Sequence, residues 1–149
     1  GVWTYNVDNA DVNYLKEGET KVETFTVTSV DGTTHDIKVT ITGTNDKAEI
    51  AGDDAGAVTE DDRQVVLSDT GTLTISDDDT GESVFKTDAA SIKASEGALG
   101  RLTITETGVW TYNVDNADVN YLKEGETKVE TFTVTSVDGT THDIKVTIT

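Results

Sequence analysis

The chain has 149 residues and a formal net charge of −18 at pH 7, with 29 Asp and Glu residues against 11 Lys and Arg residues. Such an acidic chain excludes nucleic-acid binding through phosphate neutralisation and argues against binding to anionic membranes. Cys, Pro and Met are absent, which excludes disulfides, thiolate metal sites and thiol nucleophiles. No segment is long and apolar enough to span a bilayer, and the residues given do not predict a signal peptide. Because the first residues, GVWTYNVDN, are typical of the middle of a folded unit, we expect an internal piece of a longer protein.

Residues 1–42 recur without a single change as residues 108–149, at an offset of 107 residues. This offset is too long for a solenoid repeat and matches the size of one β-sandwich domain. We therefore expect residues 1–42 to be the C-terminal half of a preceding repeat. Residues 43–47 are then an interdomain linker, and residues 48–149 form one complete repeat. Perfect repetition in series favours a spacer over an enzyme, because each copy adds length and no new chemistry.

Alternating apolar residues predict a series of short strands in the complete repeat. In chain order these strands are residues 72–76, 101–105, 108–114, 131–135 and 143–149. The residues expected to face inward are Leu73, Ile75, Leu102, Ile104, Trp110, Tyr112, Val114, Phe132, Val134, Ile144, Val146 and Ile148.

Turns and one helical segment connect these strands. Thr107-Gly108 and Asp138-Gly139 are typical hairpin turns. The spacing of Val119 and Leu122 predicts a single helical turn within residues 116–126, which crosses between sheets. Roughly seven short strands of this kind predict an all-β fold, an antiparallel immunoglobulin-like or cadherin-like β-sandwich in a tandem array.

The negative charge is concentrated in residues 43–107, which carry a net charge of −10 against −4 in each copy of the repeated segment. It lies in short clusters at strand ends: Asp46, Asp53-Asp54, Glu60-Asp61-Asp62, Asp77-Asp78-Asp79 and Glu82. The strand at 71–76 is expected to run toward the N-terminal pole of the sandwich. This direction brings the loop at 77–82 to the linker and to the 138–139 turn, whereas residues 60–62 lie at the opposite pole.

Clustered oxygen ligands are typical of calcium sites, since calcium takes six to eight oxygens in flexible geometry. We therefore predict a calcium site, against the alternative of a solvated acidic surface. The candidate ligands are Asn45, Asp46, Asp77, Asp79, Glu82 and Asp138, with Glu60 at the next junction.

Other kinds of metal site are disfavoured. Zinc would need His or Cys ligands, and His35 and its copy His142 are expected to be exposed strand residues. The loop begins like an EF-hand with Asp77-x-Asp79. However, Gly81 and Asp88 occupy its fifth and twelfth positions, and no helices flank it.

The ordered motifs of the complete repeat resemble a known family. They are GTND, VTEDD, GTLTISDDDTGE, GRLTITETGVWTYNVDN, LKEGET and ETFTVTSVDG. The chain is similar to the VCBS-type tandem repeats of giant RTX or LapA-like bacterial surface adhesins. The resemblance implies secreted, cell-surface extender modules with calcium at their junctions, and neighbouring repeats as partners. It implies that Asn45 and Asp46 are linker ligands, that Asp77, Asp79 and Glu82 come from the following domain, and that Glu60 serves the next junction.

Two other functions compete with this reading. Outward threonines in T-x-T rows are compatible with a module that binds a polysaccharide or ice, although Thr is also a common polar choice on strand surfaces. An enzyme is disfavoured because G-x-S-x-G and H-E-x-x-H are absent and only one distinct His position exists. Residues 43–107 are the front half of the complete repeat, and residues 1–42 have no such half before them. We therefore expect Trp3, Tyr5 and Phe25 to be buried against a neighbouring molecule.

Overall fold

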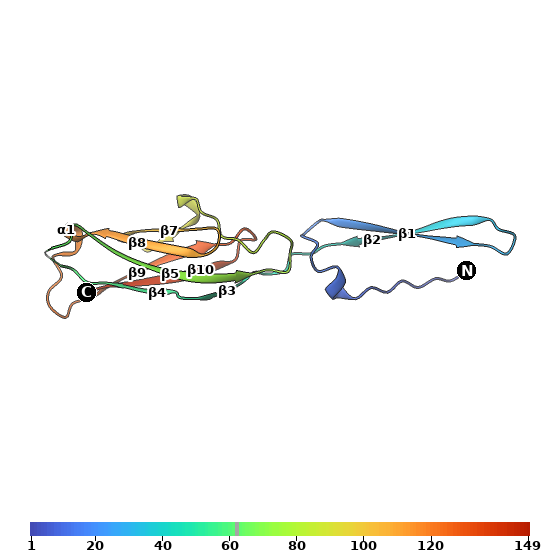
Figure 1. Ribbon diagram of the computed structural model, residues 1–149. Coiled ribbons are helices and arrows are strands. Elements are labelled where there is room, and N and C mark those ends of the chain that lie inside the picture. Colours follow the sequence, from blue (N-terminus) through green and yellow to red (C-terminus); the bar gives the residue numbers. More distant parts are fainter. Residues whose placement is uncertain (62) are drawn as a thin grey trace. The chain divides into compact units, whose positions relative to one another are not determined.

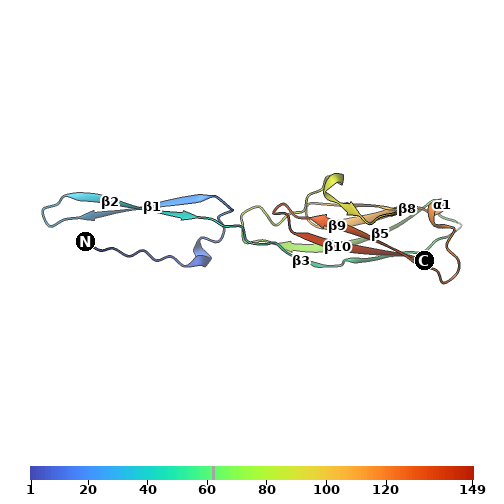
Figure 2. The same ribbon diagram turned by 180° about the vertical axis from the view of Figure 1, so that it is seen from behind.

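The protein is described by a computed structural model that covers residues 1–61 and 63–149. It divides into two compact units, which are described separately (Figure 1, Figure 2). The first unit contains residues 1–46 and 78–80, and the second contains residues 47–77 and 81–149. The chain therefore passes between the units at three points, two of them within residues 77–82, which we call the acidic loop.

The second unit is a sandwich of two four-stranded sheets. One sheet has the order β3 (Glu49–Gly52), β5 (Val66–Ser76), β8 (Val109–Asp115) and β7 (Arg101–Ile104). The other has the order β4 (Ala55–Val58), β10 (Thr141–Ile148), β9 (Lys128–Thr135) and β6 (Lys93–Ala94). The predicted all-β sandwich is confirmed, and its strands at 72–76, 101–105, 108–114, 131–135 and 143–149 correspond to β5, β7, β8, β9 and β10.

The sandwich begins with two short strands that precede those predicted, β3 and β4. The chain passes from one sheet to the other after Gly52. Before this point β3 pairs with β5 in one sheet, and after it β4 pairs with β10 in the other. Gly52 has a φ of +117°, and a Cβ there would lie 2.6 Å from the Thr72 carbonyl oxygen. The change of sheet therefore requires glycine at this position. The β4–β10 pair is parallel, which makes the sheet mixed and not purely antiparallel as expected.

The core lies between the two sheets and contains the residues predicted to face inward, although Ile75 is only partly buried. It also contains Val58, Leu67 and Phe85, which were not predicted. Trp110, Tyr112 and Ile144 are fully buried, and the ring centroids of Tyr112 and Phe132 are 5.7 Å apart. A short helix, α1 (Asn116–Val119), carries the chain from β8 in one sheet to β9 in the other, as predicted. A short 3₁₀ helix, η2 (Ala89–Ser91), precedes β6.

The first unit is built on a hairpin of β1 (Thr20–Thr28) and β2 (Thr34–Thr42), preceded by the 3₁₀ helix η1 (Asn9–Asp11). The segment before η1 is extended, and the Tyr5 ring contacts the Phe25 ring with centroids 5.8 Å apart. Trp3 and Phe25 are nevertheless 57% and 45% exposed. Two strands do not enclose the face that a second sheet covers in the other unit. The expected burial of these residues against a neighbouring molecule stays a prediction.

Candidate metal centre

The acidic loop begins where β5 ends, at the edge of the second unit that carries the start of β3. Ser76, the last residue of β5, pairs with Glu49, the first residue of β3. The predicted direction of this strand is therefore confirmed. The loop is closed by Ser83, whose hydroxyl accepts a 2.9 Å hydrogen bond from the Asp77 N–H and donates to the Asp77 carbonyl oxygen at 3.2 Å.

The middle of the loop, residues 78–80, belongs to the first unit. Asp79 is only 1% exposed, and its Oδ2 accepts a 2.9 Å hydrogen bond from the Asp46 N–H. On either side, Asp78 Oδ2 accepts from Asn13 Nδ2 at 3.0 Å, and the Thr80 N–H donates to the Tyr14 carbonyl oxygen at 3.2 Å. The predicted convergence of Asp46 and Asp79 is thus observed within the first unit.

The other predicted ligands around the loop differ in exposure. Asn45 and Asp46 are exposed, and Asn45 Nδ2 donates a 3.0 Å hydrogen bond to the Asp46 carbonyl oxygen. This bond uses the amide nitrogen and not the oxygen that would bind calcium. Asp77 and Glu82 are half-buried residues of the second unit.

Asp138, whose role as a calcium ligand stays a prediction, accepts hydrogen bonds on both carboxylate oxygens. Its Oδ1 accepts hydrogen bonds from the Ser136 hydroxyl and the Thr140 N–H, and its Oδ2 accepts from the Ala48 N–H at 3.0 Å and the Thr140 hydroxyl at 2.8 Å. Burial raises the pKa of this carboxyl, but these hydrogen bonds outweigh burial and hold the pKa well below its usual range. A carboxylate has about four acceptor positions, and these four hydrogen bonds occupy all of them. Asp138 therefore stabilises the β9–β10 turn and anchors the start of the second unit at Ala48.

Glu60 lies at the other end of the second unit, as predicted. Its N–H donates a 2.9 Å hydrogen bond to the Thr149 carbonyl oxygen, and β4 and β10 end beside it with Val58 paired to Ile148. The N–H of Asp61 donates to Asn116 Oδ1 at 3.1 Å. Asp62, the third acid of this cluster, lies outside the described residues.

The chemistry of the donor set suits a hard cation. Across residues 1–61 and 63–149, no three side chains of His, Cys, Asp or Glu lie close enough together to form a metal site by themselves. Calcium, however, also takes backbone carbonyl, amide and water oxygens. The acidic loop and the linker supply only oxygen donors, and the buried Asp79 carboxylate already contacts the linker backbone. These residues fit calcium and do not fit zinc.

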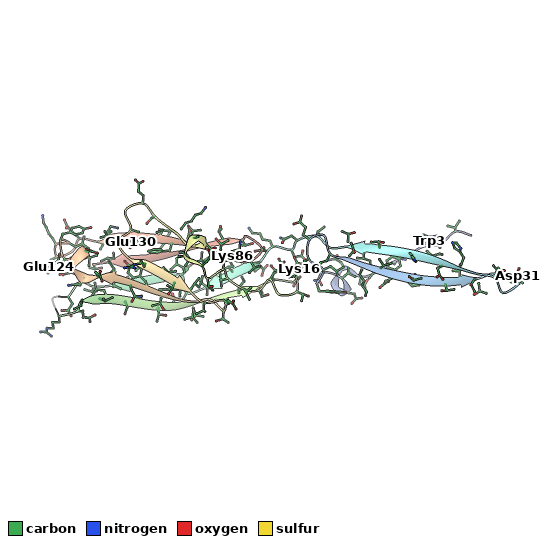
Figure 3. All side chains as sticks on the ribbon, turned by 90° about the horizontal axis from the view of Figure 1, so that it is seen from above. Trp3, Lys16, Asp31, Lys86, Glu124 and Glu130 are labelled. Carbon is green, nitrogen blue, oxygen red and sulfur yellow. The ribbon has the colours of Figure 1, made fainter. Side chains whose placement is uncertain are left out.

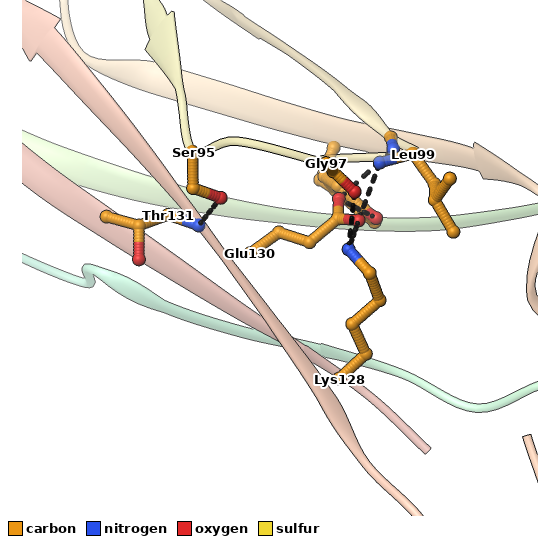
Figure 4. A network of polar contacts seen from close by, with 8 residues as sticks. Ser95, Gly97, Leu99, Lys128, Glu130 and Thr131 are labelled. Carbon is orange, nitrogen blue, oxygen red and sulfur yellow. Dashed lines mark hydrogen bonds and ion pairs between the residues drawn. The ribbon is translucent and has the colours of Figure 1, made fainter.

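Sequence reasoning missed a buried polar network in the second unit (Figure 4). The fully buried Glu130 carboxylate accepts hydrogen bonds from the Leu99 N–H at 2.7 Å, the Gly100 N–H at 3.0 Å, the Tyr112 hydroxyl at 2.9 Å and the Lys128 ammonium at 2.7 Å. The signal was present in the sequence, because Glu130 alternates with the inward residues Phe132 and Val134. The network fixes the loop before β7 onto β9.

A family model described as "Bacterial cadherin-like domain" matches residues 45–149, and no curated protein matches the chain. One similar solved structure is a protein of unknown function from Porphyromonas gingivalis W83, with 15% identity and a TM-score of 0.39. That match covers 88% of this chain and 66% of the other. Among the described residues, no helix has both the length and the apolarity to cross a membrane. The family match covers residues 45–149, more than two thirds of the chain, and the chain therefore belongs to the family of bacterial cadherin-like domains.

Proposed function

We propose that the chain is a calcium-stabilised extender module of a secreted bacterial surface adhesin of the RTX or LapA-like kind. In this role, tandem repeats hold a distal ligand-binding region away from the cell surface. One observation carries the proposal: the Asp79 carboxylate is buried and accepts a hydrogen bond from the Asp46 N–H. Asp79 belongs to the first unit with residues 78 and 80, whereas residues 77 and 81 belong to the second unit.

The family assignment supports the general part of this proposal. Bacterial cadherin-like domains are structural or adhesion-type modules, usually extracellular or surface-associated, and they are typically not enzymes. The perfect repetition of residues 1–42 as 108–149 adds support, because a spacer gains length from each identical copy.

Asp46 and Asp79 would hold the calcium ion, together with Asn45, Asp77 and Glu82. A bound ion supplies positive charge that offsets the repulsion among these carboxylates. The acids 77–79 are adjacent in sequence, and their mutual repulsion is strong wherever water is excluded. Asp79 serves as the link, because its second oxygen already accepts the linker N–H. Neutralisation of the loop then favours a single arrangement of loop and linker over many.

A polysaccharide-binding or ice-binding module would present aromatic side chains on its surface. In the complete sandwich Trp110 and Tyr112 are 0% exposed, and Tyr121, at 59%, is the single exposed aromatic side chain among the described residues of that unit. The outward threonines of β9 alternate with the core residues Phe132 and Val134, as the solvent face of an ordinary strand does. We therefore retain the extender function.

Thermal unfolding with calcium and with EDTA tests this proposal. A ligand that binds only the folded state stabilises it by about 2.7 kcal/mol at 100 times its Kd, so the melting temperature should rise by several degrees. Asp79→Asn should remove most of the calcium-dependent rise. Asp118→Asn, a matched loss of one exposed carboxylate in α1, should retain it. Equal melting temperatures of the unmodified chain in calcium and EDTA would refute the proposal.

A further inference from the structure

The two identical copies of the repeated segment have different surroundings, and comparing them defines an uncovered surface. Trp110, Val114, Phe132 and Val134 are each at most 2% exposed in the second unit. Their counterparts in the first unit are Trp3, Val7, Phe25 and Val27, which are 57%, 41%, 45% and 47% exposed. We call these four residues the open face; Figure 3 labels Trp3 beside the hairpin.

Exposed apolar residues on the opposite side of the hairpin provide an internal control. Val22 and its counterpart Val129 are both 55% exposed, so Val22 belongs to a surface that stays in solvent even in the complete sandwich. The open face is different, because its residues are exposed only where the front half of the repeat is not packed on them.

The second unit shows what covers this face. The core residues that pack against the copied segment come from residues 43–107, namely Val58, Leu67, Leu73, Phe85, Leu102 and Ile104. The same segment pairs with both edges of the β9–β10 hairpin, through β4 on β10 and β6 on β9. Among the described residues, by contrast, β1 and β2 form a sheet of two strands.

The buried carboxylate of Glu130 and its counterpart Glu23 also differ in their contacts with the front half. Glu130 accepts the N–H groups of Leu99 and Gly100, which belong to the front half. Its counterpart Glu23 accepts the Tyr5 hydroxyl at 2.8 Å and pairs with Lys21 at 3.4 Å. The first unit thus has the carboxylate, the tyrosine and the lysine of the network in place before any front half binds.

We propose that the open face of residues 1–42 is a docking surface for the front half of a repeat, a polypeptide with the chemistry of residues 43–107. A second intact copy of the chain is not the occupant, because each copy has one front half, and that half already covers its own residues 108–149. Docking adds one strand to each edge of the β1–β2 hairpin, buries Trp3 and Phe25, and gives Glu23 two backbone N–H donors. The interaction is independent of calcium and of the proposed junction site.

The test uses the full chain labelled with 5-fluorotryptophan, whose two tryptophans give two ¹⁹F signals that Trp3→Phe assigns. The probe is a synthetic polypeptide with the sequence of residues 43–107, which has no tryptophan, added in EDTA. We expect saturable 1:1 binding that moves the Trp3 signal toward that of Trp110 and leaves the Trp110 signal in place. Phe25→Ala should weaken binding about 30-fold or more, as loss of a buried aromatic anchor does. The matched control Val22→Ala should not.

A genetic fusion covers the case in which the free probe is insoluble. The sequence of residues 43–107 is placed directly before Gly1 of the full chain, and the Trp3 signal should then coincide with that of Trp110. A Trp3 signal that is unmoved in the fusion, or by saturating soluble probe, overturns the proposal. So does a Trp3 signal that shifts with chain concentration alone, because a second copy would then be the occupant.

Discussion

The hydroxyl of Tyr112 donates a 2.9 Å hydrogen bond to the carboxylate of Glu130, and neither side chain is exposed to solvent. The same two residue types meet again in the first unit, where Tyr5 donates to Glu23 at 2.8 Å. Because the second pair lies on a partly exposed surface, the chain contains its own control for the effect of burial on this interaction.

Replacement of Glu130 by Gln should destabilise the second unit. Glutamine has one acceptor oxygen in place of two and carries no negative charge. The charge that Lys128 and the backbone N–H groups of Leu99 and Gly100 stabilise is therefore lost. Hydrogen bonds to a charged group contribute about 1.5–3 kcal/mol each when they are lost, so we expect a decrease in unfolding free energy of about 2 kcal/mol or more. Urea denaturation followed by Trp110 fluorescence measures it. Glu23→Gln should leave that transition unchanged, and equal losses in the two variants would contradict the assignment.

The stability of the second unit should depend on pH through Glu130. Burial alone would raise the pKa of this carboxyl, but the bonds from Lys128, Leu99, Gly100 and Tyr112 lower it below the ordinary value. A lowered folded-state pKa gives stability that is complete above the unfolded pKa of about 4.3 and is lost as the pH falls through the folded-state pKa. The difference between the unmodified chain and Glu130→Gln should therefore be constant from pH 7 to about 5 and shrink below pH 4. A difference that stays constant down to pH 2 would show that the carboxyl has no altered pKa.

Asp138 and its copy Asp31 allow the contact with Ala48, at the start of the second unit, to be measured separately. Both carboxylates bind the hydroxyl and N–H groups of their own turn, but Asp138 also accepts the Ala48 N–H. Asp138→Asn should reduce the unfolding free energy of the second unit by about 1–2 kcal/mol, with faster hydrogen exchange at Ala48. Asp31→Asn should leave both quantities of the second unit as they are. Unchanged exchange at Ala48 in Asp138→Asn would disprove the anchoring role.

The two tryptophans should report opposite environments. With Trp110→Phe, the remaining Trp3 should emit at long wavelength and be quenched readily by acrylamide, because it is 57% exposed. With Trp3→Phe, the buried Trp110 should emit at shorter wavelength and resist quenching, since its indole N–H also donates to the Asp53 carbonyl oxygen at 2.7 Å. Similar quenching constants in the two variants would be incompatible with the structure.

The parts of the fold that could be predicted are those in which one face of a strand is buried. Alternation located β8, β9 and β10, because Trp110, Phe132 and Ile144 each belong to a run of alternate buried residues. It missed β4 and β6, since Ala55–Val58 is made of small residues and Lys93–Ala94 is only two residues long. Pairing with a neighbouring strand, and not local preference, makes these segments strands.

The candidate site was predictable in position but not in detail. The direction of β5 places the acidic loop, and the Asp46–Asp79 contact follows from it. The role of Asp138 could not be predicted, because its hydrogen bond to Ala48 joins residues 90 positions apart. The exposure of Trp3 could not be derived from local sequence either, because its identical copy Trp110 is fully buried.

The central proposal, that calcium at the acidic loop favours a single arrangement of loop and linker, can be tested directly by a distance measurement. The chain has no cysteine, so spin labels can be attached at Lys38→Cys and Lys145→Cys, two equivalent exposed strand positions in the two copies. We expect double electron–electron resonance to give a narrow distance distribution in calcium and a broad one in EDTA, with Asp79→Asn broad in both. Distributions of the same width in calcium and in EDTA would contradict the account.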